Sequence, residues 1–376
     1  MTMARPSRSI LLLAGSLGVH DEGWSIRPFL DRLARHGVSA QVLCVEAAGD
    51  AAADVRVVGA AGLGSRWRLP LTVRGLRFGE RLNVPDLLHV LQSRMSAAGL
   101  AIAEHWGIPS VQTIDEFVPA DGRLRLSRRW CRRLVATSRE LADDLIGQLR
   151  VPAERITVVN PGIEAPETEP VRDRGRRVAV IGSAGPLVAG SGFATFLNAA
   201  RKVIDAGVDA EFVIAGQGED EVDLRRRAHR LKIADRVTFA GIPVVGLRFW
   251  NVLDVYCQTA LEPSVGRTLA TALAFGVPSV ASDIGGLRAL VEHGRNGLRV
   301  PPGDSSALAA QVLALLADSA SARRLGHEGR EMILREFNPE AETLMLAGVY
   351  AEALDDRGAP HSGPRSSALR ALGHPA

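Results

Sequence analysis

An acidic side chain, a glycine-containing turn and an apolar helical stretch follow one another in the last third of the chain. The segment begins at Glu262, continues through Gly266 and Arg267, and closes with the pair Gly285-Gly286. A carboxylate can accept hydrogen bonds from hydroxyl groups, and free amides at the start of a helix attract an anion such as a phosphate. Open α/β sheets collect such groups at the carboxyl edge of their strands, so this order predicts a nucleotide or sugar site.

Two halves of the chain alternate short β-rich runs with amphipathic stretches, which predicts an α/β protein with two doubly wound, Rossmann-like parallel sheets. In the first half we expect strands at 10–14, 40–45, 55–58, 87–90, 110–113, 134–137 and 156–160, and helices at 25–36, 95–105 and 139–149. In the second half we expect strands at 177–181, 211–215, 237–240, 255–258 and 279–282, and helices at 193–205, 220–231, 244–253 and 266–275, with others beyond 304. The two carboxyl edges are expected to face each other across a cleft.

A stretch rich in proline and acidic residues at 163–176 lacks periodicity and is typical of a linker. It separates an N-terminal domain over 1–162 from a C-terminal domain over 177–338. A final helix is expected over 339–355, with a possible return to the N-terminal domain, and the Pro/Gly/Ser/Arg-rich tail over 356–376 is expected to be disordered.

The composition is that of a soluble globular protein, with 46% hydrophobic and 23% charged residues among 376. Cys44, Cys131 and Cys257 are far apart and show neither metal-ligand spacing nor a disulfide pattern, which suits a reducing cytoplasm. The apolar run over 10–14 is too short for a signal sequence or a membrane span. We therefore expect a cytoplasmic protein.

An ordered set of segments resembles the retaining family 4 (group 1) glycosyltransferases of the GT-B fold. Besides the segment that begins at Glu262, the resemblance covers 85–89, 134–138, 158–164, 215–218 and 296–304. It implies two Rossmann-like domains that face each other across a cleft. It also implies transfer of a sugar from a nucleotide-sugar donor to a hydroxyl acceptor, on a glycan or a lipid-linked glycan of cell-envelope type. The anomeric configuration would be retained, and no metal or other cofactor would be needed.

The resemblance also assigns roles on the donor side. Glu262 would bind the donor sugar as a catalytic residue, and Thr271 would lie near the ribose. The remaining candidates for donor binding are Gly185, Ser191, Gly216, Gly266, Arg267 and Thr268. A solvated loop carboxylate remains the alternative for Glu262, and a solvated surface arginine the alternative for Arg267.

The chain departs from the family pattern at several donor-site positions. Pro186 and Ser191 stand where the family has an arginine and a lysine, Thr271 replaces a glutamate, and Ala289 occupies a position that is often glutamate. A neutral hydrogen bond in place of a charge-assisted pair is weaker by about 1–2 kcal/mol. These substitutions leave a second hypothesis open, in which the protein is a catalytically silent family member that binds a glycan or a partner protein.

In the first half, Asp115 aligns with a position where the family commonly has a histidine. It could act on the acceptor or on developing positive charge, or it could cap a loop. Gly18, His20 and Gly23 are candidates for an acceptor loop, whereas isolated histidines such as His20 and His89 are more often structural. The loop after the first strand lacks G-x-G-x-x-G, which argues against a nicotinamide-dependent dehydrogenase.

Two arginine-rich patches interleave charge with apolar side chains. The first contains Arg66, Arg68, Arg74, Arg77 and Arg81, and the second contains Arg123, Arg125, Arg128, Arg129, Arg132 and Arg133 around Trp130. Such patches suit an anionic membrane surface, an acidic acceptor or a simple solvated face. No nucleic-acid recognition motif accompanies them, so nucleic acid is not an expected partner. Peripheral attachment to the inner face of a membrane is therefore one expectation.

Overall fold

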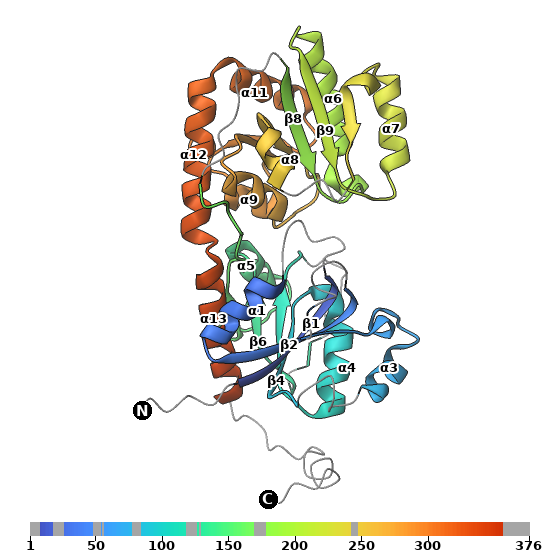
Figure 1. Ribbon diagram of the computed structural model, residues 1–376, viewed down its shortest axis with the longest axis vertical. Helices are drawn as coiled ribbons and strands as arrows, with labels where there is room; N and C mark the ends of the chain where they lie inside the picture. The colour runs from blue at the N-terminus through green and yellow to red at the C-terminus, as the bar shows by residue number, and fades with distance from the viewer. Residues whose placement is uncertain are drawn as a thin grey trace, which may run out of the picture. The chain divides into compact units, whose positions relative to one another are not determined.

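The computed structural model describes residues 8–17, 26–47, 54, 56–76, 84–117, 126–127, 129–168, 178–241 and 247–355. The chain divides into two compact units, each built around one sheet (Figure 1). Unit 1 comprises Met1–Pro161 together with Pro339–Ala376, and unit 2 comprises Gly162–Asn338. The linker segment over 169–177 and the tail over 356–376 lie outside the described residues.

Unit 1 contains a parallel sheet of seven strands in the order β3-β2-β1-β4-β5-β6-β7. Its strands are β1 (Arg8–Leu17), β2 (Val38–Ala47), β3 (Val57–Gly59), β4 (Leu87–Val90), β5 (Ser110–Ile114), β6 (Cys131–Ala136) and β7 (Ile156–Val158). Its helices are α1 (Ile26–Arg35), α3 (Leu69–Gly75), α4 (Ser96–Trp106), α5 (Arg139–Gly147) and α13 (Pro339–Asp355). Short 3-10 turns occur at η1 (Ala61–Gly64), η2 (Ser93–Met95) and η3 (Ala153–Arg155).

The apolar run of β1 is buried on both faces of this sheet. Ile10 and Leu12 pack into a cluster with α1 and α13, whereas Leu11 and Leu13 pack into a cluster with α3 and α4. Successive side chains of a strand point to opposite faces, so a continuous apolar run is what a doubly covered strand requires. This explains why the first strand reads as unbroken leucine and isoleucine.

His89 connects α13 to the sheet of unit 1. Its Nδ1 lies 2.7 Å from the Tyr350 hydroxyl and its Nε2 lies 2.8 Å from Thr113 Oγ1. Complete burial lowers the pKa of His89 to about 3, so the imidazole is neutral. His89 therefore has a structural role, as expected for an isolated histidine.

Unit 2 contains a parallel sheet of six strands in the order β10-β9-β8-β11-β12-β13. Its strands are β8 (Ala179–Ala184), β9 (Ala210–Ala215), β10 (Val237–Phe239), β11 (Val255–Gln258), β12 (Ser279–Ser282) and β13 (Leu298–Val300). Its helices are α6 (Phe193–Asp205), α7 (Glu221–Arg230), α8 (Leu247–Val252), α9 (Arg267–Ala274), α10 (Gly285–Leu290), α11 (Ser305–Ala317) and α12 (Ser319–Glu336). Short 3-10 turns occur at η4 (Ala189–Ser191) and η5 (Ala234–Arg236). The prediction of two doubly wound parallel sheets is confirmed.

Helix α12 packs closely against the end of α9. A Cβ atom at Gly326 would lie only 2.2 Å from the carbonyl oxygen of Gly276, so the glycine permits this approach. The buried Arg330 donates hydrogen bonds to the carbonyl oxygens of Ala274 and Pro166. A cation therefore satisfies the C-terminal end of α9 and holds the segment over 162–168 on unit 2.

Some elements differ from the expectation. Strand β8 runs to Ala184, three residues beyond the expected end at 181, and a Cβ at Gly182 would lie 2.6 Å from the Leu253 side chain. Gly182 is therefore a glycine that packing requires within β8, and it is not the first residue of the following loop. Helices α3 and α10 were not expected because proline and glycine occur in their first turns. Residues 244–246, the start of the helix expected at 244–253, lie outside the described residues.

Within the described residues, no single helix has the length and apolar character needed to cross a bilayer. Among the described residues, the segments Ser305–Ala317 and Ser319–Asp355, taken together across a bend of 105°, have the length and composition to do so.

Candidate functional site

The strand order of unit 2 creates a topological switch point at the carboxyl edge of its sheet. β8 lies between β9 and β11, and the chain leaves β8 toward one side of the sheet and leaves β11 toward the other. Open α/β sheets bind ligands at such a switch point, outside the carboxyl ends of the strands. Here the switch point lies between the turn over 185–192, which follows β8, and residues 259–262, which follow β11.

These two segments touch through their backbones. The amide of Leu261 donates to the Gly190 carbonyl at 2.8 Å, and Thr259 Oγ1 donates to the Ser191 carbonyl at 3.1 Å. Gly192 has a φ of +72°, and a Cβ there would lie 1.9 Å from the Thr259 carbonyl oxygen. Only glycine fits at this position, and the two segments form one continuous surface.

Glu262 lies on this surface against Gly190. A Cβ at Gly190 would meet Glu262 Oε2 at 2.7 Å and Glu262 Cδ at 2.8 Å, so the carboxylate occupies the space that a side chain would need. Glu262 is exposed. The structure therefore brings together Glu262, Ser191 and the glycine turn at the switch point, with a carboxylate available to accept hydrogen bonds.

A third loop, after β9, closes against the same turn. Gly216 has a φ of +149°, and a Cβ there would lie 1.9 Å from the Gly185 carbonyl oxygen. The Gly185 amide donates to the Ala215 carbonyl at 3.0 Å, and the Leu187 amide donates to the Gln217 carbonyl at 2.9 Å. Gly185 and Gly216 therefore join two loops, and the Gly185 amide is already engaged within the protein.

Most amides of the turn are used in the same way. Donors to backbone carbonyls include the amides of Gly185, Leu187, Val188, Ser191 and Gly192. Among the described residues, the amides of Ala189 and Gly190 have no such acceptor. The sequence suggested that the whole turn could present amides to an anion. In the structure this part is limited to Ala189 and Gly190, which lie beside Glu262.

The turn that opens α9 packs on α10. Gly266 has a φ of +73°, and a Cβ there would lie 2.6 Å from side-chain carbons of Leu287 and Leu290. Its amide donates to Ser264 Oγ at 3.2 Å. A Cβ at Gly285 would lie 2.9 Å from the Cα of Pro263. The glycines of this region thus allow the loop after Glu262 to approach α10 closely.

Thr268 and Thr271 are buried in this helix, whereas Arg267 is exposed. Thr271 Oγ1 donates to the Arg267 carbonyl at 3.1 Å, within α9. Thr268 Oγ1 lies 3.1 Å from Gln258 Oε1, which the Tyr256 hydroxyl also contacts. Sequence reasoning missed this network, although a tyrosine and a glutamine in a short buried strand were a signal that polar partners lay nearby.

Asp115 caps a turn in unit 1. Its Oδ1 accepts from the Ser93 amide at 2.7 Å, and its own amide donates to Ser93 Oγ at 3.2 Å. Ser93 opens η2, immediately before α4. This reciprocal pair matches the capping alternative. The acceptor-loop candidates Gly18, His20 and Gly23 lie outside the described residues, as do Arg77, Arg81, Arg123, Arg125 and Arg128.

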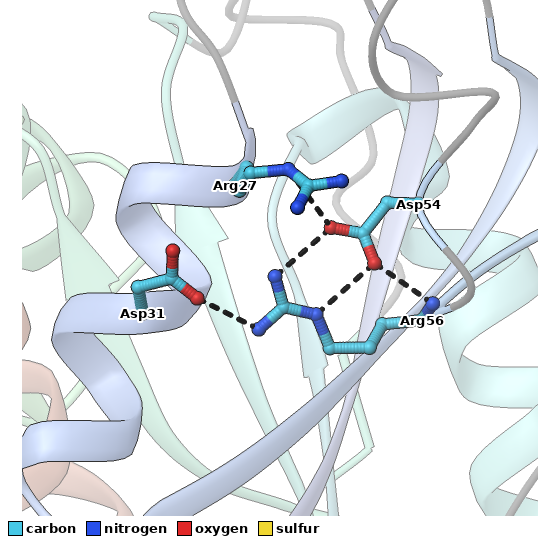
Figure 2. A network of polar contacts seen from close by, with 4 residues as sticks. All are labelled: Arg27, Asp31, Asp54 and Arg56. Carbon is cyan, nitrogen blue, oxygen red and sulfur yellow. Dashed lines mark hydrogen bonds and ion pairs between the residues drawn. The ribbon is translucent and has the colours of Figure 1, made fainter.

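A four-residue charged network in unit 1 also has a structural role (Figure 2). Asp54 accepts from Arg56 Nη2 at 2.9 Å and Nε at 3.1 Å, and Arg27 lies 3.8 Å from the same carboxylate. Arg56 also binds Asp31 of α1 at 3.0 Å. The hydrogen bonds from Arg56 lower the pKa of the buried Asp54 to about 2. The network fastens α1 to the chain that enters β3.

Two further arginines lie near the carboxyl end of β12. Asp283 accepts from Arg288 Nε at 2.9 Å and from Arg299 Nη1 at 3.0 Å, and the hydrogen bond from Arg288 is the main cause that lowers the pKa of Asp283. Both cations are therefore already paired with a carboxylate. Within the part of the chain that the structure describes, no three His, Cys, Asp or Glu side chains are grouped to hold a metal ion.

Comparison with known proteins gives a consistent assignment. Residues 24–165 match the model for Glycosyltransferase Family 4, and residues 177–318 match the model for Glycosyl transferases group 1. The D-inositol 3-phosphate glycosyltransferase of Xylanimonas cellulosilytica is 29% identical over 306 residues, which cover 72% of this chain and 73% of that protein. The N-acetyl-alpha-D-glucosaminyl L-malate synthase of Bacillus anthracis is 28% identical over 149 residues, which cover 40% of this chain and only 39% of that protein.

A solved structure has the same architecture. Anabaena HepE, in a complex with UDP and glucose, superposes with a TM-score of 0.73 at 17% identity, covering 91% of this chain and 99% of that one. At this identity the likeness concerns the fold. With both family models matched in order, and with two parallel-sheet units of the GT-B type, the chain belongs to the family 4, or group 1, glycosyltransferases.

Proposed function

We propose that this protein transfers a sugar, of the hexose type, from a nucleotide-sugar donor to a hydroxyl acceptor on a glycan or lipid-linked glycan. The observation that carries the proposal is the carboxylate of Glu262, held against Gly190 at the switch point between β8 and β11. The names of both relatives describe sugar-containing substrates or glycosyl transfer, and the HepE structure contains UDP and glucose. The transfer retains the anomeric configuration and needs no metal.

In this proposal Glu262 accepts hydrogen bonds from hydroxyls of the donor sugar. The diphosphate lies near the amides of Ala189 and Gly190 and near the exposed Arg267, which opens α9. The bond between the anomeric carbon and the diphosphate oxygen breaks, and its electron pair goes to that oxygen. The acceptor oxygen forms the new bond to the anomeric carbon, and its proton passes to the departing diphosphate. Donors placed where this charge develops lower the barrier.

A second candidate function has its own support. The turn over 185–192 contains no cationic side chain, and Pro186 and Ser191 occupy the positions of the family's clamps. The Thr271 hydroxyl donates into its own helix, and the Gly266 amide donates to Ser264 Oγ. Groups expected to bind the donor are thus engaged within the protein. A catalytically silent member that binds a nucleotide sugar or a glycan would tolerate this arrangement.

Isothermal titration calorimetry with nucleoside diphosphates and their sugar conjugates tests both candidates. We expect one conjugate to bind, and we expect Glu262→Gln to weaken that binding by about tenfold or more while free nucleotide binds as before, because the amide oxygen that remains is a neutral and weaker acceptor. Absence of binding by every nucleotide and conjugate would contradict the proposal. Binding without turnover on any acceptor would favour the silent member. Turnover is expected to persist in the presence of a chelator.

A further inference from the structure

Helix α3 and the turn before it present two large apolar side chains to solvent. Trp67 is 90% exposed and Leu71 is 72% exposed, more than any other large hydrophobic side chain among the described residues. Tryptophan usually buries most of its surface. Two such neighbours, one helical turn apart, indicate a surface that something covers.

The opposite face of the same segment is fixed in the core of unit 1. Val73 is buried, and Leu69 and Leu76 pack against the cluster that includes residues of α4. A Cβ at Gly62 would lie 2.0 Å from Thr72 Oγ1, so η1 and α3 are in close contact. The helical spacing of 69, 73 and 76 defines the inner face, and that of 67, 71 and 74 defines the outer face. Docking of the inner face therefore directs Trp67 and Leu71 outward.

The charged side chains of this segment of the chain have one sign. Arg66, Arg68 and Arg74 are exposed, and no aspartate or glutamate occurs between Arg56 and Leu76 in the sequence. Other exposed apolar side chains have a different setting, since Val222 of α7 stands between Glu221 and Asp223. The outer face of α3 thus combines an aromatic ring, an aliphatic side chain and three cations.

We propose that the exposed surface formed by the outer face of α3 and the turn before it, with the side chains Arg66, Trp67, Arg68, Leu71 and Arg74, docks on an anionic lipid bilayer. Indole rings favour the headgroup region, and arginines bind the phosphates of anionic lipids. Two apolar side chains and three cations suffice for reversible attachment. A peptide partner would require a groove, and a tryptophan that is almost fully exposed does not line one. Helix α3 lies at the periphery of unit 1 beside α4 (Figure 1). No donor-site residue takes part, so this inference does not depend on the proposed function.

Vesicle sedimentation with the full chain tests the proposal. We expect binding to vesicles of phosphatidylglycerol mixed with phosphatidylcholine, little binding to phosphatidylcholine alone, and weaker binding as salt rises. Replacing Arg66, Arg68 and Arg74 together by glutamine should weaken binding by about a hundredfold, since each cation contributes near an anionic surface. The double variant Trp67→Ser/Leu71→Ser should weaken it by about tenfold or more. Val222→Ser, which removes an exposed apolar side chain in an acidic setting, should bind as the parent does.

A spectroscopic variant separates insertion from simple charge attraction. The parent should show a blue shift of tryptophan emission with anionic vesicles, whereas Trp67→Phe should still sediment but lose most of the shift. Thermal unfolding of each variant should match the parent, because the replaced side chains are exposed. Equal binding to both vesicle types, unchanged binding of the double variant, or a preference for a soluble acidic polypeptide over vesicles would overturn the proposal.

Discussion

The carboxyl edges of the two sheets use their polar groups in different ways. In unit 2, the loops after β8, β9 and β11 meet through glycine backbones at Gly192 and Gly216, and the Glu262 carboxylate stays exposed. In unit 1, Gln92 Oε1 accepts from the Gly15 amide at 2.7 Å, and Asp115 and Ser93 bind each other. Where segments are joined through their backbones, polar side chains remain available to bind a ligand. Where they are joined through polar side chains, those side chains are already hydrogen-bonded within the protein.

Breaking a glycine junction in unit 2 should have the largest effect. Gly192→Val places a branched side chain at a positive φ and against the Thr259 carbonyl, and we expect a loss of about 4 kcal/mol in the free energy of unfolding. Gly207→Val is the matched control, because Gly207 has a φ of +83° but no atom within 4 Å of the added Cβ. It should lose about 1–2 kcal/mol, from backbone strain alone. Chemical denaturation measures both, and equal losses would contradict the close junction.

The buried His89 of unit 1 should affect how the free energy of unfolding depends on pH. The pKa of His89 falls from 6.5 to about 3 on folding, so between these values the unfolded chain binds a proton that the folded chain does not. The contribution of His89 to the free energy of unfolding is complete above pH 6.5 and is lost as the pH falls toward 3. His89→Gln should reduce the slope of unfolding free energy against pH by about 1.4 kcal/mol per unit near pH 5, measured by denaturation.

The exposed His105, replaced by glutamine, is the control for that experiment. The Asp54 carboxyl, whose pKa is lowered from 3.8 to about 2, contributes only at lower pH and does not disturb the comparison. An unchanged slope in His89→Gln would show that the imidazole is not buried in its neutral form.

Moving Glu262 without removing it sharpens the comparison further. Gly190→Ala adds a Cβ that would lie 2.7 Å from Glu262 Oε2, so the carboxylate must shift, and Gly190 has no positive φ to strain. We expect the KM for the donor to rise by about tenfold, the result of one weakened charged hydrogen bond, with stability nearly unchanged. Gly348→Ala, which meets no atom within 4 Å, is the control. Unaltered donor binding in Gly190→Ala would separate Glu262 from the donor.

Asp115 should give the smallest effect. Asp115→Ala removes the acceptor for the Ser93 amide and should cost about 1 kcal/mol of unfolding free energy. Asp115→Asn keeps an oxygen in place and should be close to the parent in both stability and turnover. A large loss of turnover in the asparagine variant, with normal stability, would instead assign the carboxylate a direct part in transfer.

The sequence was sufficient for most strands because each of them carries its own signal, whereas β13 was covered only by the resemblance over 296–304. The apolar runs of β1 and β11 and the helical period of α6 are local properties, and they predicted the doubly wound pattern. The end of β8 was missed because Gly182 resembles a loop glycine. Glycine is needed there because the side chain of Leu253, which is distant in sequence, occupies the space of a Cβ.

The site was harder to predict from the sequence, because its contacts also join residues that are distant along the chain. The place of Glu262 after β11 follows from the order of motifs, but its contact with Gly190 depends on two loops that meet only in the fold. The hydroxyl of Thr268 was expected to face a donor, yet it lies beside Gln258 in the interior. Its donor-binding role stays a prediction. Helix periodicity alone could not place this hydroxyl, because the polar partner is supplied by a neighbouring strand.

The position of α13 in unit 1 has a consequence for how the chain folds during synthesis. Leu346 and Tyr350 belong to the buried cluster of unit 1, yet they leave the ribosome after all of unit 2. Unit 2 is continuous in sequence and can complete its core first. Until α13 emerges, the part of the unit 1 sheet that it covers stays exposed to solvent.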